Sequence, residues 1–213
     1  MDFRHKVLPS YRQTFSKLAL EQKPDALFIA CSDSRVVPNL FASTDPGDLF
    51  VDRNVGNLVP PCDSLHPDAP RGSAAAALEF SVERLKVKNV IVCGHSECGA
   101  MKALWEESQA EGLPHFQDWL RQGEATLKKF REIAAPDPSL SEVNQLSQVN
   151  VLTQLEHIRS YPFIRRKLES GELMLHGWWF DIAHADVYCY ERNLNQFILI
   201  DENEAKLIME RLG

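Results

Sequence analysis

The sequence predicts an α/β fold: a mostly parallel central sheet with an antiparallel edge at its C-terminal end, flanking helices and an extended N-terminal helix. Two observations predict this class. Short, continuously apolar runs at residues 26–31 and 87–93 are typical of strands that are covered on both faces. Segments with helical spacing alternate with these runs, and such alternation is the pattern of a largely parallel sheet.

The N-terminal half should supply two helices and three strands. Residues 3–20 carry apolar side chains three, four and one residue apart, which predicts an amphipathic helix that ends before Pro24. Such a helix must bury its apolar stripe against the body of the protein or against another subunit. The other elements expected in this half are strands at 26–31, 49–51 and 87–93 (closed by Gly94), a proline-rich ordered loop at 59–71 and an alanine-rich helix at 72–85.

The C-terminal half should begin with helices and end with strands. Residues 100–107 predict a helix, and residues 113–170 have helical patterning that is broken at prolines. The remaining expectations are strands at 173–175, 187–190 and 197–200, which would form the antiparallel edge, and a final helix at 202–212.

Composition excludes several functions. The 213 residues suit one α/β domain, with two smaller domains as the alternative. The net charge of -7 argues against nucleic acid as a partner, since phosphate binding needs a basic face. No apolar run approaches the length of a membrane-spanning helix, so membrane insertion is not expected. Five cysteines without a secretory signal favour reduced thiols in the cytoplasm, with a carboxysome or another compartment as the alternative.

Three potential metal ligands follow two of the predicted strands. Cys31 ends the first strand, and His95 and Cys98 lie just after the third, with Gly94 and Gly99 on either side to allow a sharp bend. Thiolate and imidazole are ligands of zinc, and three protein ligands leave one tetrahedral position open, as in catalytic sites. The alternative is that these cysteines are ordinary buried residues.

Four segments together resemble the β-class carbonic anhydrases of plant and cyanobacterial type. They are Cys-Ser-Asp-Ser-Arg at 31–35, Arg-Asn-Val-Gly-Asn at 53–57, Gly-His-Ser-Glu-Cys-Gly at 94–99 and His-Gly-Trp at 176–178. Their order and separations match the family over nearly the whole chain. The resemblance therefore implies one β-carbonic anhydrase domain over residues 1–213.

The resemblance also implies a reaction, which is the reversible hydration of CO2 to bicarbonate and a proton by a zinc-bound hydroxide. It implies that Cys31, His95 and Cys98 hold one Zn²⁺ per chain. Asp33 and Arg35 would form a catalytic dyad, and Asp33 would become a fourth zinc ligand if the site closed.

Substrate and subunit contacts follow from the same resemblance. Gln22 would bind bicarbonate, and Phe50 and Phe80 would line the CO2 pocket, with Phe80 standing where plant-type members usually have tyrosine. A homodimer or a dimer of dimers is expected. The alternatives are a hydrolase of CS2 or COS on the same fold and a non-catalytic zinc protein, although a structural zinc site would need neither Asp33 nor Arg35.

Overall fold

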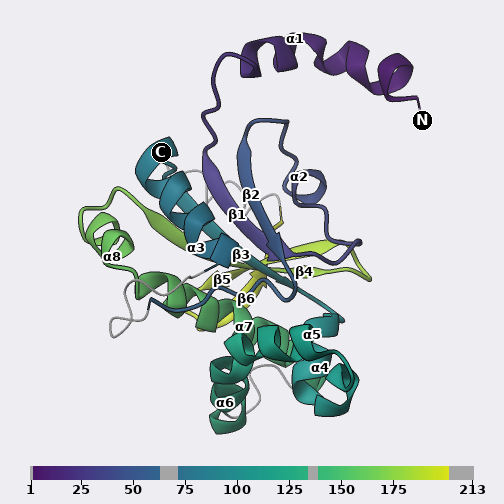
Figure 1. The fold of residues 1–213 in the computed structure, drawn as a ribbon, viewed down its shortest axis with the longest axis vertical. Helices are drawn as coiled ribbons and strands as arrows, with labels where there is room; N and C mark the ends of the chain where they lie inside the picture. Colours follow the sequence, from purple (N-terminus) through teal and green to yellow (C-terminus); the bar gives the residue numbers. More distant parts are fainter. Residues whose placement is uncertain (1, 63–71, 134–138, 202–213) are drawn as a thin grey trace.

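A six-stranded sheet with the order β2-β1-β3-β4-β5-β6 forms the centre of the molecule (Figure 1). The structure is a computed structural model and describes residues 2–62, 72–133 and 139–201. The strands are β1 (Ala26–Cys31), β2 (Leu49–Asn54), β3 (Asn89–His95), β4 (Met174–Asp181), β5 (Asp186–Glu191) and β6 (Gln196–Leu199).

The strand directions confirm the predicted fold class. Strands β2, β1, β3 and β4 run parallel to one another, whereas β5 is antiparallel to β4 and β6 is antiparallel to β5. Every residue of β1 is buried, as is expected for a strand covered on both faces. Because β1 and β3 are parallel neighbours, their carboxyl ends lie at the same edge of the sheet.

The strand ends differ from the prediction: β2, β4 and β5 are longer, whereas β3 keeps its predicted length but is shifted by two residues. Strand β3 does not close at Gly94 but continues to His95, because residues 94 and 95 pair with Trp179 and Phe180 of β4. Strand β4 extends far beyond residue 175, and β2 extends beyond residue 51. Apolar runs marked only the best-buried parts of these strands, whereas backbone pairing with neighbouring strands determines where they end.

Prolines begin two of the helices that they were expected to interrupt. Pro114 and Pro162 occupy the first turns of α5 and α8, where the missing N–H has no intrahelical partner to lose. The predicted helix at 72–85 is α-helical to Glu79 and continues as a π-helical segment, Phe80–Leu85. The helices are α1 (Leu8–Leu18), α2 (Pro38–Phe41), α3 (Gly72–Glu79), α4 (Gly99–Trp105), α5 (Pro114–Leu120), α6 (Glu124–Glu132), α7 (Glu142–Arg159) and α8 (Pro162–Glu169). Short 3-10 segments, Glu107–Ala110 and Arg121–Gly123, join α4, α5 and α6.

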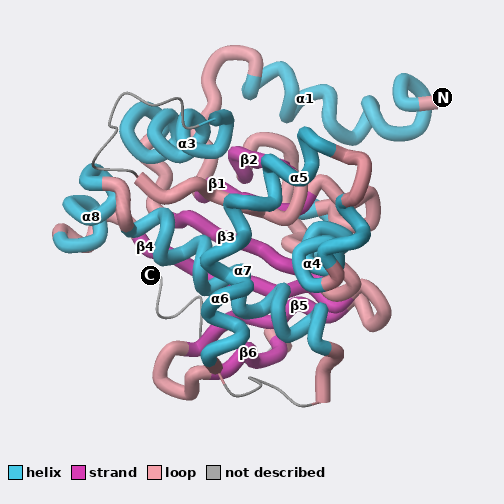
Figure 2. The backbone as a smooth tube through the Cα atoms, turned by 60° about the horizontal axis from the view of Figure 1, so that its bottom comes forward, coloured by secondary structure: helices cyan, strands magenta, loops and turns pink. Residues whose placement is uncertain are grey.

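Helix α7 packs directly against β3 and β4, and Figure 2 shows it lying across the strands. Two glycines allow this close approach. A Cβ atom on Gly94 would lie 2.8 Å from Val151 Cγ2, and one on Gly177 would lie 3.0 Å from Val151 Cγ1. The middle of α7 is thereby held at a fixed position against the strand that ends in His95.

The N-terminal helix lies away from the rest of the chain, at the top of Figure 1. It begins as a π-helical turn, Phe3–Val7, and continues as α1, and the structure describes both segments and buries none of their residues. Phe3, Val7 and Phe15 are each more than 40% exposed (44%, 42% and 41%). The apolar stripe predicted from the sequence is therefore present, but at Phe3, Val7 and Phe15 the described part of the chain leaves it largely uncovered.

Two expected elements, the loop at 59–71 and the helix at 202–212, fall largely or wholly outside the described residues. Among the helices that the structure describes, none is both long and apolar enough to cross a membrane.

Two histidines form structural hydrogen bonds, since His157 Nδ1 lies 2.8 Å from Val59 O and His176 Nε2 lies 3.0 Å from Asn89 Oδ1.

Candidate metal centre and active site

Cys31, His95 and Cys98 converge at the carboxyl edge of the parallel strands. Cys31 is the last residue of β1, His95 is the last residue of β3, and Cys98 is the N-cap of α4. Their ligand atoms all lie within 4.8 Å of one another, and all three residues are buried. The sequence prediction that these residues form one group is therefore confirmed.

The donor set fits a zinc ion. His95 Nδ1 lies 2.8 Å from Ser96 O, which assigns the ring proton to Nδ1 and leaves the lone pair of Nε2 free. Nε2 is fully buried and has no hydrogen-bond partner among the described residues. A buried polar atom without a partner is costly, and a metal ion shared with two thiol sulfurs would satisfy it.

The two thiols have opposite pKa shifts because they share a proton. The hydrogen bond from the Cys98 thiol lowers the pKa of Cys31 to about 4, against the opposing effect of burial, and His95 and the Gly56 N–H contribute further. The same contact with Cys31, together with burial, raises the pKa of Cys98 well above its usual value. The lowered pKa favours the thiolate form of Cys31, which is the form in which cysteine binds a metal ion.

The bend between His95 and Cys98 occurs at a different residue from the one expected. Gly94 lies within β3, and its missing side chain makes room for α7. Gly99 begins α4 and has open space where a side chain would be. The residue with left-handed backbone geometry is Glu97, with a φ of 54°. The loop is therefore strained at a non-glycine residue, and the surrounding contacts must hold it there.

Asp33 and Arg35 form the predicted pair. Arg35 Nε donates to Asp33 Oδ1 at 3.0 Å, and a terminal guanidinium nitrogen donates to Asp33 Oδ2 at 2.8 Å. The guanidinium holds the pKa of the Asp33 carboxyl well below its usual range. Arg53 donates to the carbonyls of Cys31 and Asp33, which fixes the backbone between the metal group and the dyad. Asp33 is thus turned toward Arg35 and lies outside the metal-ligand group of the described residues.

A cavity of about 410 Å³ opens beside Cys31. Asp33 and Ser32 lie on one part of its wall, and helix α4 contributes Ala100 and Ala103. Trp119 of α5 donates a hydrogen bond of 2.7 Å to Val55 O, which ties α5 to another wall residue. The remaining described lining residues are Cys31, Gly99, Gln109 and Phe116.

Sequence reasoning identified Cys31 and Asp33 in the wall of this cavity, but it assigned no pocket role to the other lining residues. Val55 lies inside the Arg-Asn-Val-Gly-Asn segment, so its place in that motif was the available signal. Ala100 and Ala103 share a helix face through their spacing of three residues. Gln109 and Phe116 come from the segment after α4 and gave no signal, because only the folded chain brings that segment back to the metal group.

Gln22, Phe50 and Phe80 are not among the described residues that line this cavity. Gln22 is exposed and precedes β1, whereas Cys31 ends that strand, and the six residues of β1 span roughly 16 Å. Phe50 pairs with Leu27 near the start of β1, and its ring contacts Phe80 with a centroid distance of 5.7 Å. Their roles as pocket residues stay predictions, and within one chain they lie away from the metal group.

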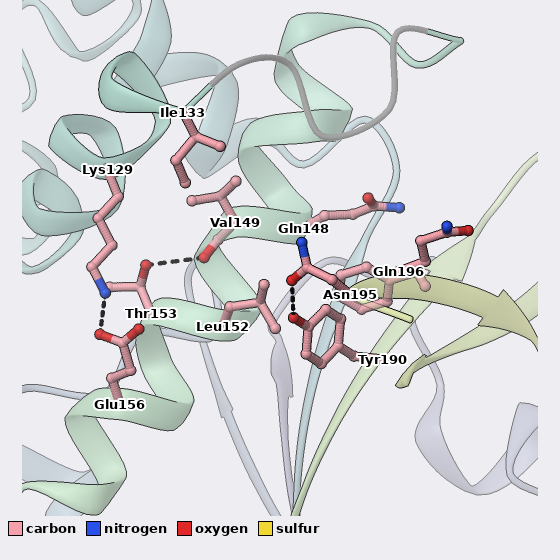
Figure 3. Close-up of a pocket in the computed structure, with 11 residues that line it drawn as sticks. Lys129, Ile133, Gln148, Val149, Leu152, Thr153, Glu156, Tyr190, Asn195 and Gln196 are labelled. Atoms are coloured by element: carbon pink, nitrogen blue, oxygen red, sulfur yellow. Dashed lines mark hydrogen bonds and ion pairs between the residues drawn. The ribbon is translucent and has the colours of Figure 1, made fainter. Parts of the chain in front are cut away.

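A second cavity, of about 460 Å³, lies between α6, α7 and the β5–β6 hairpin (Figure 3). An ion pair between Lys129 and Glu156 stands at one end, and Tyr190 donates a hydrogen bond to Asn195 at the other (Figure 3). Its described lining contains no cysteine and no histidine. The candidate metal ligands therefore lie beside the smaller cavity, the one lined by Cys31.

Comparison with known proteins decides the family. The family model for carbonic anhydrase matches residues 26–187, which include the metal group and the dyad. The chain belongs to the carbonic anhydrase family. Its fold and its relatives place this carbonic anhydrase in the β class.

Individual relatives agree with this assignment. A carbonic anhydrase from Synechocystis sp. is 42% identical over 92% of this chain and 70% of its own length. One from Pseudomonas aeruginosa is 39% identical over 94% of this chain and 89% of its own. The solved structure of the β-carbonic anhydrase CcaA has a TM-score of 0.85 and 40% identity, covering 93% of this chain and 94% of that chain. A tetrameric β-carbonic anhydrase from Sordaria macrospora has a TM-score of 0.70 and 30% identity over 85% of this chain and 88% of its own.

Proposed function

We propose that this β-carbonic anhydrase uses one Zn²⁺ ion per chain, held by Cys31, His95 and Cys98, to hydrate CO2 reversibly to bicarbonate and a proton. The observation that carries the proposal is the convergence of three buried donor atoms within 4.8 Å, beside a cavity that also contains Asp33. Three protein donors leave one coordination position for solvent or substrate. A purely structural zinc site would be closed by a fourth protein ligand.

The residues around the metal group have separable tasks. A zinc ion in such a site supplies hydroxide at neutral pH, because it lowers the pKa of water to about 7. The Asp33 carboxylate, ionised and fixed by Arg35, would accept a hydrogen bond from a hydroxide supplied there and so orient the hydroxide's lone pair toward CO2. Val55, Ala100 and Ala103 give the cavity apolar walls suited to CO2, which has no charge and no hydrogen to donate.

The active protein is expected to be at least a dimer. The uncovered stripe of α1 and the exposed side chain of Phe80 (43%) are apolar surfaces. Their exposure to water is energetically unfavourable. A second chain would cover them, and it would bring its own Gln22, Phe50 and Phe80 within reach of the cavity beside Cys31. The tetrameric relative from Sordaria macrospora supports this assembly. Light scattering measures it directly, and a fully active monomer would contradict it.

The alternative reactions gain no support. The relatives named above are carbonic anhydrases, and nothing in the described cavity favours CS2 or COS over CO2. The intact pair of Asp33 and Arg35 argues against a non-catalytic zinc protein. A cytoplasmic location stays a prediction from the cysteine content.

Stopped-flow CO2 hydration, combined with measurement of bound zinc, tests the proposal. The wild-type protein should contain about one zinc per chain and turn over rapidly. Cys98→Ala should lose both properties, because the variant keeps only two ligands. Cys62→Ala is the matched control, since Cys62 is a half-buried thiol outside the metal group. A zinc-loaded wild-type protein without hydration activity, or a Cys98→Ala variant that keeps both zinc and activity, would contradict the proposal.

A further inference from the structure

We propose that Asn144, on the first turn of α7, is a positioning residue that sets the geometry of the metal centre by holding the loop between His95 and Cys98. The proposal rests on the proposed metal site and extends it to a residue outside the group of candidate ligands. Its basis is one hydrogen bond at the strained residue of that loop.

Glu97 is the strained residue, and it is held on both sides. Its backbone N–H donates to Asn144 Oδ1 at 2.8 Å, and its carbonyl accepts from the Arg35 guanidinium at 3.1 Å. A residue with a side chain disfavours a φ of 54°, so the loop would relax without outside contacts. Relaxation at Glu97 would move its neighbour Cys98 relative to His95.

Asn144 belongs to a helix, α7, that is fixed to the sheet by residues further along it. The backbone N–H of Asn144 donates to Ser141 Oγ, the N-cap of α7, at 3.3 Å. One turn later, Ser147 Oγ donates to His95 O at 2.8 Å and accepts from Trp179 Nε1 at 3.2 Å. The same helix face is packed against β3 and β4 through their glycines. Asn144 and Ser147 therefore contact the two ends of the ligand loop from one rigid helix.

The metal centre depends on this arrangement because zinc coordination tolerates only small displacements of the ligand atoms. Zinc–sulfur and zinc–nitrogen bonds have lengths of about 2.3 and about 2.0 Å, in tetrahedral directions. Partners that orient metal ligands commonly change metal affinity by about 10–100-fold when removed. Asn144 acts one step further out, through the backbone of Glu97, so an effect near the lower end of that range is expected.

The hydrogen bond between the Glu97 N–H and Asn144 Oδ1 should contribute little to the stability of the fold. Glu97 is exposed and Asn144 is only half-buried, so water can bond the Glu97 N–H after the amide is removed. A purely structural role would then predict almost no consequence. The positioning role predicts a changed metal site in a protein that is otherwise intact.

Cobalt substitution tests the proposal without relying on catalysis. Metal-free protein is titrated with Co²⁺ alone, and both the dissociation constant and the visible absorption of the bound ion are measured. Asn144→Ala should bind Co²⁺ about tenfold more weakly and should alter the absorption bands, which report the coordination geometry. Asn144→Asp keeps an acceptor at the same position and should stay within about threefold of wild type.

Ser141→Ala is the control for general damage to the helix. It removes the N-cap of α7 and should lower the melting temperature, but it leaves Asn144 Oδ1 in place and should preserve the cobalt spectrum. Unchanged Co²⁺ affinity and spectrum in Asn144→Ala would overturn the proposal, as would equal changes in Asn144→Asp or Ser141→Ala. These outcomes differ from failure of the proposed function, in which the wild-type protein itself would bind no metal or hydrate no CO2.

Discussion

Replacing Arg35 by glutamine should slow the reaction by releasing Asp33. In the structure the guanidinium makes two parallel hydrogen bonds to the carboxylate, at 3.0 and 2.8 Å. Glutamine has a shorter side chain with a single donor group, and it carries no charge. Asp33 would then be free to turn toward the metal group, where it would compete for the open coordination position.

The magnitude follows from the geometry and the exposure of the pair. Hydrogen bonds to charged groups contribute about 1.5–3 kcal/mol when protected from water. The Arg35 side chain is 48% exposed and that of Asp33 17%, and exposed ion pairs are worth only about 0.2–1 kcal/mol. A bidentate pair of intermediate exposure should therefore contribute about 1–2 kcal/mol, which corresponds to an about 5–30-fold change in the population of the correctly held carboxylate.

Stopped-flow CO2 hydration of zinc-loaded Arg35→Gln measures this change. We expect kcat/KM to fall by about 5–30-fold, and Arg35→Lys to lie between the variant and wild type, because an ammonium group cannot bond both carboxylate oxygens. Arg121→Gln is the matched control, since it breaks an exposed ion pair with Asp118. Activity of Arg35→Gln within twofold of wild type, or an equal loss in Arg121→Gln, would refute the role of the pair.

Three further outcomes are expected. Gly94→Ala should reduce the free energy of unfolding by about 1–3 kcal/mol in chemical denaturation, because its Cβ would lie 2.8 Å from Val151 Cγ2; unchanged stability would contradict the packing of α7 on β3. Deleting residues 1–20 should shift the protein toward monomers and reduce activity, as judged by light scattering and hydration assays, and an active dimer without them would disprove the role of α1. Metal-free protein at about pH 6 should show the ultraviolet absorbance of one thiolate per chain. This absorbance should disappear as the pH falls through the Cys31 pKa of about 4 and should be missing from Cys31→Ser; its absence from the wild type would contradict the shared proton between Cys31 and Cys98.

Several features could be predicted from the sequence because short stretches of residues determine them. The apolar runs at 26–31 and 87–93 become neighbouring parallel strands, since only a covered strand needs such a composition. Cys31 and His95 end those strands, so their convergence follows from the rule that parallel strands place their carboxyl ends at one edge. The pairing of Asp33 with Arg35 is equally local, because the two residues are only two positions apart.

Other features depend on contacts between distant segments, and only the tertiary structure decided them. The end of β3 at His95 rather than Gly94 is determined by pairing with β4. The strained residue in the ligand loop is Glu97, because Arg35 and Asn144 hold its carbonyl and its N–H from elsewhere in the chain. Sequence patterns indicate which side chains are buried away from water. The contacts between distant segments depend instead on how complete helices and strands pack against one another. For that reason the sequence alone determined the fold class and the candidate metal ligands of this carbonic anhydrase, and the folded chain determined how the loop between His95 and Cys98 and the cavity walls are held.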